Sequence, residues 1–118
     1  MNNLEKLEKI FKAMSDKNRI RILKMLQRKS LCVCEITDML KLATSTVSKH
    51  LSILRDAGLI SDWKDGKWIN YKLNTESADS MVLNSLLFVS LQIEDDVIVK
   101  EDKKQTNKVD RKFICCSG

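Results

Sequence analysis

Four cysteines are the residues of this chain best suited to chemistry, and they fall into two close pairs. Cys32 and Cys34 are separated by one residue, and Cys115 and Cys116 are adjacent near the C-terminal end. Thiolates bind soft ions and disfavour magnesium or calcium. The chain has a single histidine, so the imidazole set common in zinc sites is missing. The pattern predicts a sulfur site for a soft ion.

The first pair lies at the start of a predicted helix over residues 30–40. Side chains at positions i and i+2 of an ideal helix point about 200° apart, given 3.6 residues per turn. One ion can therefore bind both sulfurs of Cys32 and Cys34 only where the backbone is not helical, so we expect capture to distort or unwind the first helical turn. A simpler interpretation also stands, because free cysteine is often just a small buried hydrophobe.

The second pair is the candidate to complete the ligand shell. Roughly twenty extended residues span on the order of 60 Å at about 3.3 Å each, so Cys115 and Cys116 could reach the first pair within one chain or across a dimer. The alternative is an incidental pair of thiols on a frayed tail. His50 is interpreted as a packed or phosphate-contacting residue, because no second imidazole accompanies it.

A segment rich in small hydroxyl residues follows the first thiol pair. Val47, Leu51 and Leu54 recur at helical spacing, with Thr44 expected at the N-cap and Gly58 at a left-handed stop. Two short helices joined by about three residues match a helix-turn-helix. Short donors and one cation suit close approach to DNA bases and phosphates. The predicted contacts are Thr44, Ser45, Thr46, Ser48 and Lys49.

Two amphipathic helices are predicted to come before this pair. Apolar residues recur at steps of three and four over residues 3–14. Ser15-Asp16 then reads as the cap of a second helix. Its cations, which are Arg19, Arg21 and Lys24, fit either a solvated helix face or contact with phosphate.

After Gly58 the pattern changes to that of a β-hairpin. Residues 59–64 and 67–73 are rich in β-branched and aromatic side chains, and Asp65-Gly66 supplies the positive φ angles of a two-residue turn. Lys67 is the predicted wing contact to the DNA backbone, although a charged edge strand that resists aggregation is an equally good reading. The aromatic residues of the hairpin, Trp63, Trp68 and Tyr71, are interpreted as packing residues.

The C-terminal third is predicted to contain one apolar helix and a charged tail. Residues 80–93 are too apolar for a free surface, so they form either the centre of the fold or a dimer seam. Acids and bases are balanced over residues 94–112, which favours a mobile linker. We therefore divide the chain into a DNA-binding and dimerisation domain, 1–93, and a flexible tail, 94–118, that ends in the second thiol pair.

Composition narrows the function class. The 118 residues carry a formal charge of +5, which is compatible with a polyanion partner. No signal peptide and no apolar stretch of roughly 18 residues is present, so a cytoplasmic protein with reduced thiols and no membrane partner is expected. No acid–base partner accompanies the tail thiols and no cofactor loop is found, which argues against an enzyme.

Three stretches of the sequence resemble the ArsR family of metal-responsive repressors, closest to the arsenical-resistance repressors. They are Leu31-Cys32-Val33-Cys34-Glu35, residues 45–59 with their Ser-Lys-His-Leu core, and residues 66–73 with Gly-Lys-Trp. The resemblance covers residues 4 to 93. It implies an α+β, mostly α fold: a winged helix-turn-helix whose first and last helices form the seam of a homodimer. It also implies a repressor that leaves double-stranded operator DNA when trivalent arsenic or antimony binds.

One departure from the family pattern concerns the ligands. The best-known arsenical repressors carry a third cysteine at the position of Thr37, so we assign the third sulfur to Cys115 or Cys116. Use of both would give a four-sulfur site suited to Cd(II), Pb(II) or Zn(II), and cadmium-sensing relatives share the Cys-Val-Cys segment. A thiol redox or persulfide switch on the same fold is the remaining alternative.

Overall fold

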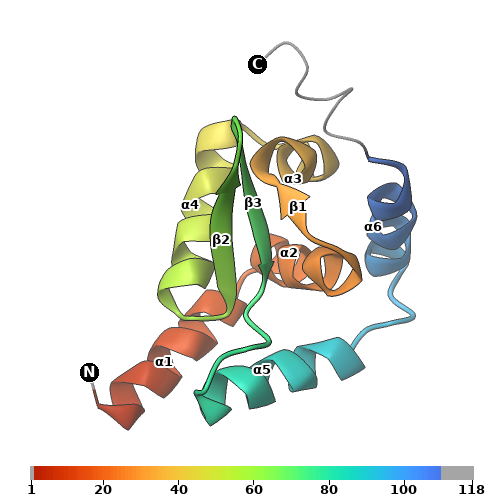
Figure 1. The fold of residues 1–118 in the computed structure, drawn as a ribbon. Coiled ribbons are helices and arrows are strands. Elements are labelled where there is room, and N and C mark those ends of the chain that lie inside the picture. The colour runs from red at the N-terminus through yellow and green to blue at the C-terminus, as the bar shows by residue number, and fades with distance from the viewer. Residues whose placement is uncertain (1, 110–118) are drawn as a thin grey trace.

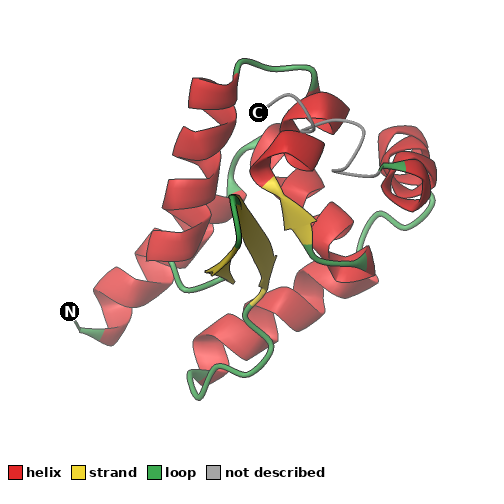
Figure 2. Ribbon diagram, turned by 45° about the horizontal axis from the view of Figure 1, so that its top comes forward, coloured by secondary structure: helices red, strands yellow, loops and turns green. Residues whose placement is uncertain are grey.

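The computed structural model describes residues 2–109, which form a helical domain with one small sheet (Figure 1). In this part of the chain the hairpin of the sheet projects between α4 and α3 (Figures 1 and 2), and most residues of β2 are exposed. The elements in chain order are α1 (Asn3–Met14), α2 (Lys17–Arg28), β1 (Leu31–Cys32), α3 (Val33–Leu40), α4 (Thr44–Asp56), β2 (Ile60–Asp65), β3 (Trp68–Leu73), α5 (Ser80–Leu91) and α6 (Val97–Lys108).

The first helix begins and ends where the sequence predicts, and the second begins where its predicted cap lies. α1 covers residues 3–14, and Asp16 is the N-cap of α2. The Asp16 carboxylate accepts hydrogen bonds from the backbone N–H groups of Asn18 and Arg19 at 2.8 and 3.1 Å. Such bonds satisfy donors that have no partner within the helix. The local sequence is therefore sufficient to place this helix start.

The sheet has one more strand than the sequence predicts. Its antiparallel order is β1-β3-β2, and the short β1 pairs Leu31 with Tyr71 and Cys32 with Asn70. The hairpin is confirmed, but its turn is shifted by one residue. Asp65 pairs with Trp68 as the last residue of β2, so the two loop residues are Gly66 and Lys67. Gly66 has φ +61°, which only glycine adopts at little cost.

The core lies between α2, α3, α4 and the base of the sheet. Its largest fully buried side chains include Ile22, Leu23, Ile36, Leu51 and Leu54. At the end of α4 the chain turns through Gly58, whose φ of +81° confirms the predicted left-handed stop. A side chain at this position would also meet Val82 Cγ2 of α5 at 3.3 Å.

α5 meets the core with only one of its faces. Val82 and Leu86 are buried, while the opposite face leaves its apolar residues exposed: Leu83, Leu87, Phe88 and Leu91. The neighbouring α1 likewise exposes Leu4 and Phe11, at 79% and 60%. An apolar surface of this extent on a small domain is typical of a protein–protein interface.

The prediction of a mobile charged linker is wrong for residues 97–108, which form α6. This helix packs on α2 and also contacts α3, and Val99, Asp102 and Thr106 are buried. The Asp96 carboxylate caps it, accepting from the N–H groups of Ile98 and Val99. Apart from Asp102, the charged residues of α6 lie on its solvent face, and the helix it packs on, α2, is too distant in sequence for composition to reveal. No helix of the described residues is long and apolar enough to cross a membrane.

Candidate thiol site and DNA interface

Cys32 lies at the junction of β1 and α3. It is fully buried and is the N-cap of α3, with extended backbone angles of φ −87° and ψ 166°. α3 therefore begins at Val33, and the prediction of a helix already formed at Cys32 is wrong. The argument that two helical sulfurs diverge by about 200° does not apply, because Cys32 is outside the helix. An unwound first turn is not a precondition for sharing an ion.

Glu35 holds this junction together. The Cys32 backbone N–H donates to Glu35 Oε1 at 2.9 Å. In return the Cys32 sulfur accepts from the Glu35 backbone N–H, which completes a capping box. Burial raises the pKa of the Cys32 thiol above its usual 9.0; the N–H bonds from Glu35 and Cys34 oppose this effect, and the Glu35 carboxylate adds to it. Glu35 is itself buried, and sequence reasoning did not identify it.

Cys34 lies half-buried in the first turn of α3, one turn before Thr37. Thr37 Oγ1 is buried without a hydrogen-bond partner among the described residues. Residues 2–109 contain no group of three or more His, Cys, Asp or Glu side chains placed to hold a metal ion. The predicted ligands Cys115 and Cys116 lie outside the described residues. Cys34 is disulfide-bonded in this structure, so ion binding concerns the reduced protein, in which the two sulfurs fit a soft ion by donor type and need further ligands.

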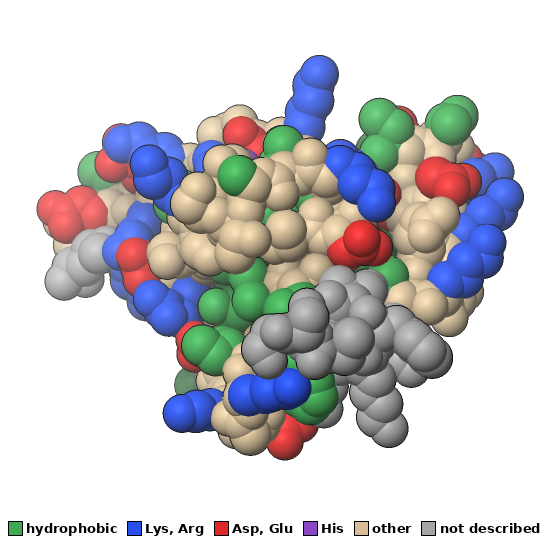
Figure 3. Space-filling view, turned by 90° about the horizontal axis from the view of Figure 1, so that it is seen from above, with side chains coloured by type: hydrophobic (Ala, Val, Ile, Leu, Met, Phe, Trp, Pro, Cys, Tyr) green, Lys and Arg blue, Asp and Glu red, His purple; other side chains and the backbone are tan. Residues whose placement is uncertain are grey.

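α3 and α4 form the predicted helix-turn-helix. Lys41, with φ 57°, ends α3 in the left-handed conformation, and α4 begins at Thr44 with Ala43 as its N-cap. The expected capping role of Thr44 is thus wrong by one position, because Thr44 is already helical. The predicted DNA-contacting residues at this end of α4 are all exposed: Thr44, Ser45, Thr46, Ser48 and Lys49. Viewed from above, Lys and Arg side chains project around the margin of this face, interspersed with acidic ones (Figure 3).

Arg19 fixes α4 against the first two helices. Its Nη1 lies 3.1 Å from His50 Nδ1, and its Nε donates to the Ala13 carbonyl at 2.8 Å. The guanidinium thus connects the C-terminal end of α1 with the middle of α4. His50 is a packed residue in this arrangement, which is one of the two roles that the sequence left open.

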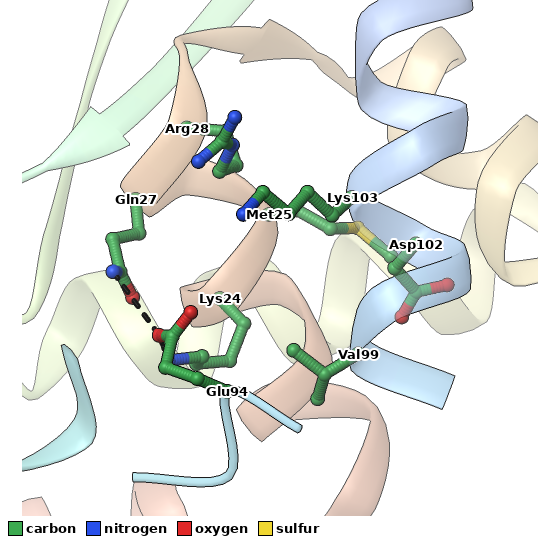
Figure 4. Close-up of a pocket in the computed structure, with 8 residues that line it drawn as sticks. All are labelled: Lys24, Met25, Gln27, Arg28, Glu94, Val99, Asp102 and Lys103. Carbon is green, nitrogen blue, oxygen red and sulfur yellow. Dashed lines mark hydrogen bonds and ion pairs between the residues drawn. The ribbon is translucent and has the colours of Figure 1, made fainter. Parts of the chain in front are cut away.

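The other cations of α2 are also engaged inside the molecule. Arg21 Nε and Nη2 bind the two Asp102 oxygens at 2.9 and 3.0 Å. Lys24 is 5% exposed, and its Nζ donates to the carbonyls of Val89, Ser90 and Gln92 at the end of α5 and pairs with Glu94. Figure 4 shows Lys24 beside Glu94, with α6 next to them. Arg21 and Lys24 therefore neither face solvent as free charges nor contact phosphate, which were the two roles expected from the sequence.

The wing presents Lys67 at its tip. Lys67 is exposed, and its Nζ lies 5.2 Å from the centre of the Trp68 ring. Trp63 is 41% exposed and lies under Lys72 Nζ at 5.6 Å, so its role as a packing residue is partial. Arg55 Nη1 bonds Asp62 Oδ2 at 3.0 Å and ties the base of the wing to α4.

A helix-turn-helix followed by a β-hairpin defines the class of winged DNA-binding domains. The solved structure of HlyU from Vibrio cholerae superimposes with a TM-score of 0.62 and 31% identity, over 75% of this chain and 91% of HlyU. The model of the family described as "Bacterial regulatory protein, arsR family" matches residues 16–62. This match and the similarity to the arsenical resistance operon repressor described below show that the chain belongs to the ArsR family. Its relatives and fold neighbours are transcriptional regulators and not enzymes.

Three relatives indicate the range of this similarity. An uncharacterized HTH-type transcriptional regulator of Methanocaldococcus jannaschii is 46% identical over 72 residues, 60% of this chain and 81% of the relative. The arsenical resistance operon repressor of Bacillus subtilis is 38% identical over 84 residues, 70% and 80% of the two chains. A cadmium resistance regulatory protein CadC homolog of Staphylococcus aureus is 35% identical over 80 residues, 67% and 66% of the two chains.

Proposed function

We propose that the protein is a dimeric transcriptional repressor that leaves its operator when a soft, thiol-binding ion occupies Cys32, Cys34 and one or both tail cysteines. The observation that supports it best is the position of Cys32. This residue carries a thiol and is also the N-cap of α3. A residue that would bind the ion therefore also caps α3, the first helix of the helix-turn-helix.

Coupling follows from the contacts around Cys32. To share an ion with Cys34, the Cys32 thiol has to lose its proton; the hydrogen bond from the Glu35 N–H can remain, because it favours the thiolate. A thiolate beside the buried Glu35 carboxylate places two negative charges in a low-dielectric environment, which is costly. Movement of Glu35 then removes the acceptor of the Cys32 N–H and loosens the start of α3. Since α3 supports α4, the DNA-contacting residues change position.

DNA binding is assigned to the exposed end of α4 and to Lys67 of the wing. The dimer is assigned to the exposed apolar faces of α1 and α5, where Phe11 and Phe88 line one groove. Two-fold symmetry then predicts a palindromic operator with half-sites about one DNA turn apart. Because the ion and the DNA favour different conformations, each must lower affinity for the other by the same factor.

Trivalent arsenic or antimony is the inducer that three sulfurs suit. The Bacillus subtilis relative named as an arsenical resistance repressor supports this choice. Four sulfurs would suit Cd(II), Pb(II) or Zn(II), and the CadC homolog supports that alternative. A redox or persulfide switch on the same cysteines would act without any ion and would be reversed by reductant.

Arsenite stoichiometry and sulfur coordination number, measured on the intact reduced protein under anaerobic conditions, test this proposal. We expect one arsenite per monomer and three sulfurs by X-ray absorption, falling to two in the Cys115→Ser/Cys116→Ser variant. Three sulfurs in that variant would overturn the assignment of the tail. Absence of arsenite and cadmium binding in the wild-type protein would overturn the ion-responsive function itself.

A further inference from the structure

We infer that His50 donates a hydrogen bond from its outer ring nitrogen, Nε2, to a phosphate of the DNA backbone, and that Arg19 is the positioning residue that prepares the ring for this contact. The inference rests on the proposed function and adds to it a DNA-contacting residue and the part of the DNA that this residue binds. The sequence left packing and phosphate contact open for His50, and its two ring nitrogens can serve both roles at once.

Arg19 is held firmly at the junction of α1 and α2. Its Nε and Nη2 donate to the carbonyls of Ala13 and Lys12 at 2.8 and 3.2 Å. These carbonyls lie in the last turn of α1, where backbone acceptors have no partner within the helix. Arg19 Nη1 also lies 4.0 Å from Asp16 Oδ2, and the Arg19 side chain is only 13% exposed. The guanidinium therefore cannot turn away from His50 without giving up these contacts.

The contact with Arg19 decides which ring nitrogen of His50 carries the hydrogen. Arg19 Nη1 lies 3.1 Å from His50 Nδ1. A guanidinium has donors and no acceptor, so Nδ1 has to be the acceptor of this bond. A neutral imidazole carries one hydrogen, which is then on Nε2. Arg19 thereby makes Nε2 a hydrogen-bond donor.

Nε2 is open to solvent at the edge of the DNA-contacting surface. It has no partner among the described residues and is not buried. Successive residues of a helix are about 100° apart, so His50 lies between the buried stripe that includes Val47 and Leu54 and the exposed Thr46. One edge of the ring therefore meets Arg19 inside the domain, and the other edge lies on the side of Thr46, a predicted DNA contact.

A phosphate is the acceptor that this position fits. Residues at the start of a recognition helix contact the base edges, whereas His50 lies more than one turn beyond Thr44 and against the start of α2. The side of a recognition helix that borders its neighbour meets the wall of the groove, where phosphate and sugar oxygens accept most protein–DNA hydrogen bonds. The exposed Lys49, one residue away, supplies the charge that a neutral donor lacks.

Nitrogen NMR tests the position of the hydrogen in the wild-type protein. His50 is the only histidine, so protein made without a histidine tag gives one set of imidazole nitrogen signals. In reduced, ion-free protein at about pH 8, above the range in which histidine usually titrates, we expect the hydrogen on Nε2. Arg19→Met should release the ring to a mixture of the two tautomers. Arg28→Met removes an exposed cation at the other end of α2 and should change nothing. A hydrogen on Nδ1 in the wild type would overturn the inference.

Substitutions that keep one ring nitrogen at a time test the contact with DNA. Asparagine places an acceptor near the position of Nδ1, and glutamine places a donor near that of Nε2. His50→Asn should keep the melting temperature of the wild type, because Arg19 retains its acceptor, and should bind DNA about tenfold more weakly. His50→Gln should bind DNA more tightly than His50→Asn and melt at a lower temperature. Because a neutral donor releases no counterion, the slope of log affinity against log salt should not change.

Affinity is measured by fluorescence anisotropy on a duplex selected by the reduced, ion-free protein and on an unrelated duplex. A phosphate contact predicts equal loss on both in His50→Asn. Wild-type affinity of His50→Asn would overturn the inference, and so would a loss confined to the selected duplex, which would indicate a base contact. A wild-type protein that binds neither duplex would instead refute the proposed function.

Discussion

The backbone N–H of Cys32 donates to the Glu35 carboxylate across 2.9 Å, so a thiol-bearing residue and the start of α3 share one hydrogen-bonded unit. β1 extends this unit, since Cys32 pairs with Asn70 of the wing strand β3. A change at the Cys32 sulfur therefore reaches both the supporting helix of the helix-turn-helix and the wing. This arrangement explains how ion binding at a buried thiol could alter a DNA-binding surface.

Replacing Glu35 tests the strength of this unit in the ion-free protein. Glu35→Ala removes the acceptor of the Cys32 N–H and should cost about 1–2 kcal/mol in the free energy of unfolding, measured by urea denaturation. Glu35→Gln keeps an amide oxygen as acceptor and should retain most of that stability. Equal stability of wild type and Glu35→Ala would show that the cap contributes nothing.

The Arg21–Asp102 pair predicts how firmly α6 is attached. Asp102→Asn leaves a guanidinium without its carboxylate, and the cost should be on the order of 2–3 kcal/mol, because Arg21 keeps a quarter of its side chain exposed. Hydrogen exchange should show lost protection in α6 and little change in α4. The matched control is Glu101→Gln on the solvent side of α6. Unchanged exchange in both variants would contradict the importance of the pair.

Acid should destabilise the fold partly through Asp16. Burial tends to raise the pKa of this carboxyl, but the backbone hydrogen bonds from Arg19 and Asn18 outweigh it and hold the pKa below its usual 3.8. The resulting stabilisation is fully present above pH 3.8 and is lost as the pH falls through the lower folded value. Asp16→Asn caps the helix without titrating, so its melting temperature should fall less steeply below about pH 4. If the melting temperatures of the wild type and Asp16→Asn fell equally steeply with pH, this role of Asp16 would be contradicted.

Lys49 should contribute to DNA affinity mainly through phosphate. Lys49→Ala should weaken binding to specific and nonspecific duplexes alike and lower the slope of log affinity against log salt by about one. Lys104→Ala, an exposed cation on α6, is the matched control and should leave the slope unchanged. The measurement is fluorescence anisotropy over a salt series. An equal loss in both variants would point to net charge instead of a contact.

The exposed aromatic residues of α1 and α5 should hold the dimer together. Phe88→Glu places a charge on the proposed seam and should yield monomers in sedimentation equilibrium, with circular dichroism unchanged because Phe88 is 62% exposed. Ile69→Glu introduces the same charge on an exposed wing residue and should leave the dimer intact. If the Phe88→Glu protein remained dimeric, the dimer interface would have to lie on another face of the molecule.

Local signals account for the parts of the fold that sequence predicted. Amphipathic spacing placed α1, and the Asp16 cap placed α2, because both depend on residues within a few positions of each other. β1 was missed because two residues give no periodic pattern and become a strand only by pairing with Tyr71 and Asn70. α6 was taken for a linker because the residue that holds it, Arg21, is 81 positions away from Asp102.

In the candidate site, too, the features set by local sequence could be predicted and those set by distant contacts could not. The spacing of Cys32 and Cys34 was sufficient to identify the thiols, but their geometry depended on where α3 begins. Pairing with β3 keeps the Cys32 backbone extended, and the capping box with Glu35 places the start of α3 at the next residue, Val33. A Cys followed three residues later by Glu is the local signal for such a box, and it was present in the sequence.

Operator affinity of the ion-loaded and ion-free protein tests the central claim most directly. A duplex selected from a random library by the ion-free, reduced protein serves as the operator, and affinity is measured by anisotropy with and without arsenite in anaerobic buffer. The account predicts weakening of tenfold or more by arsenite in the wild type and none in Cys32→Ser/Cys34→Ser. Equal affinity of the loaded and empty wild-type protein, with arsenite demonstrably bound, would contradict it.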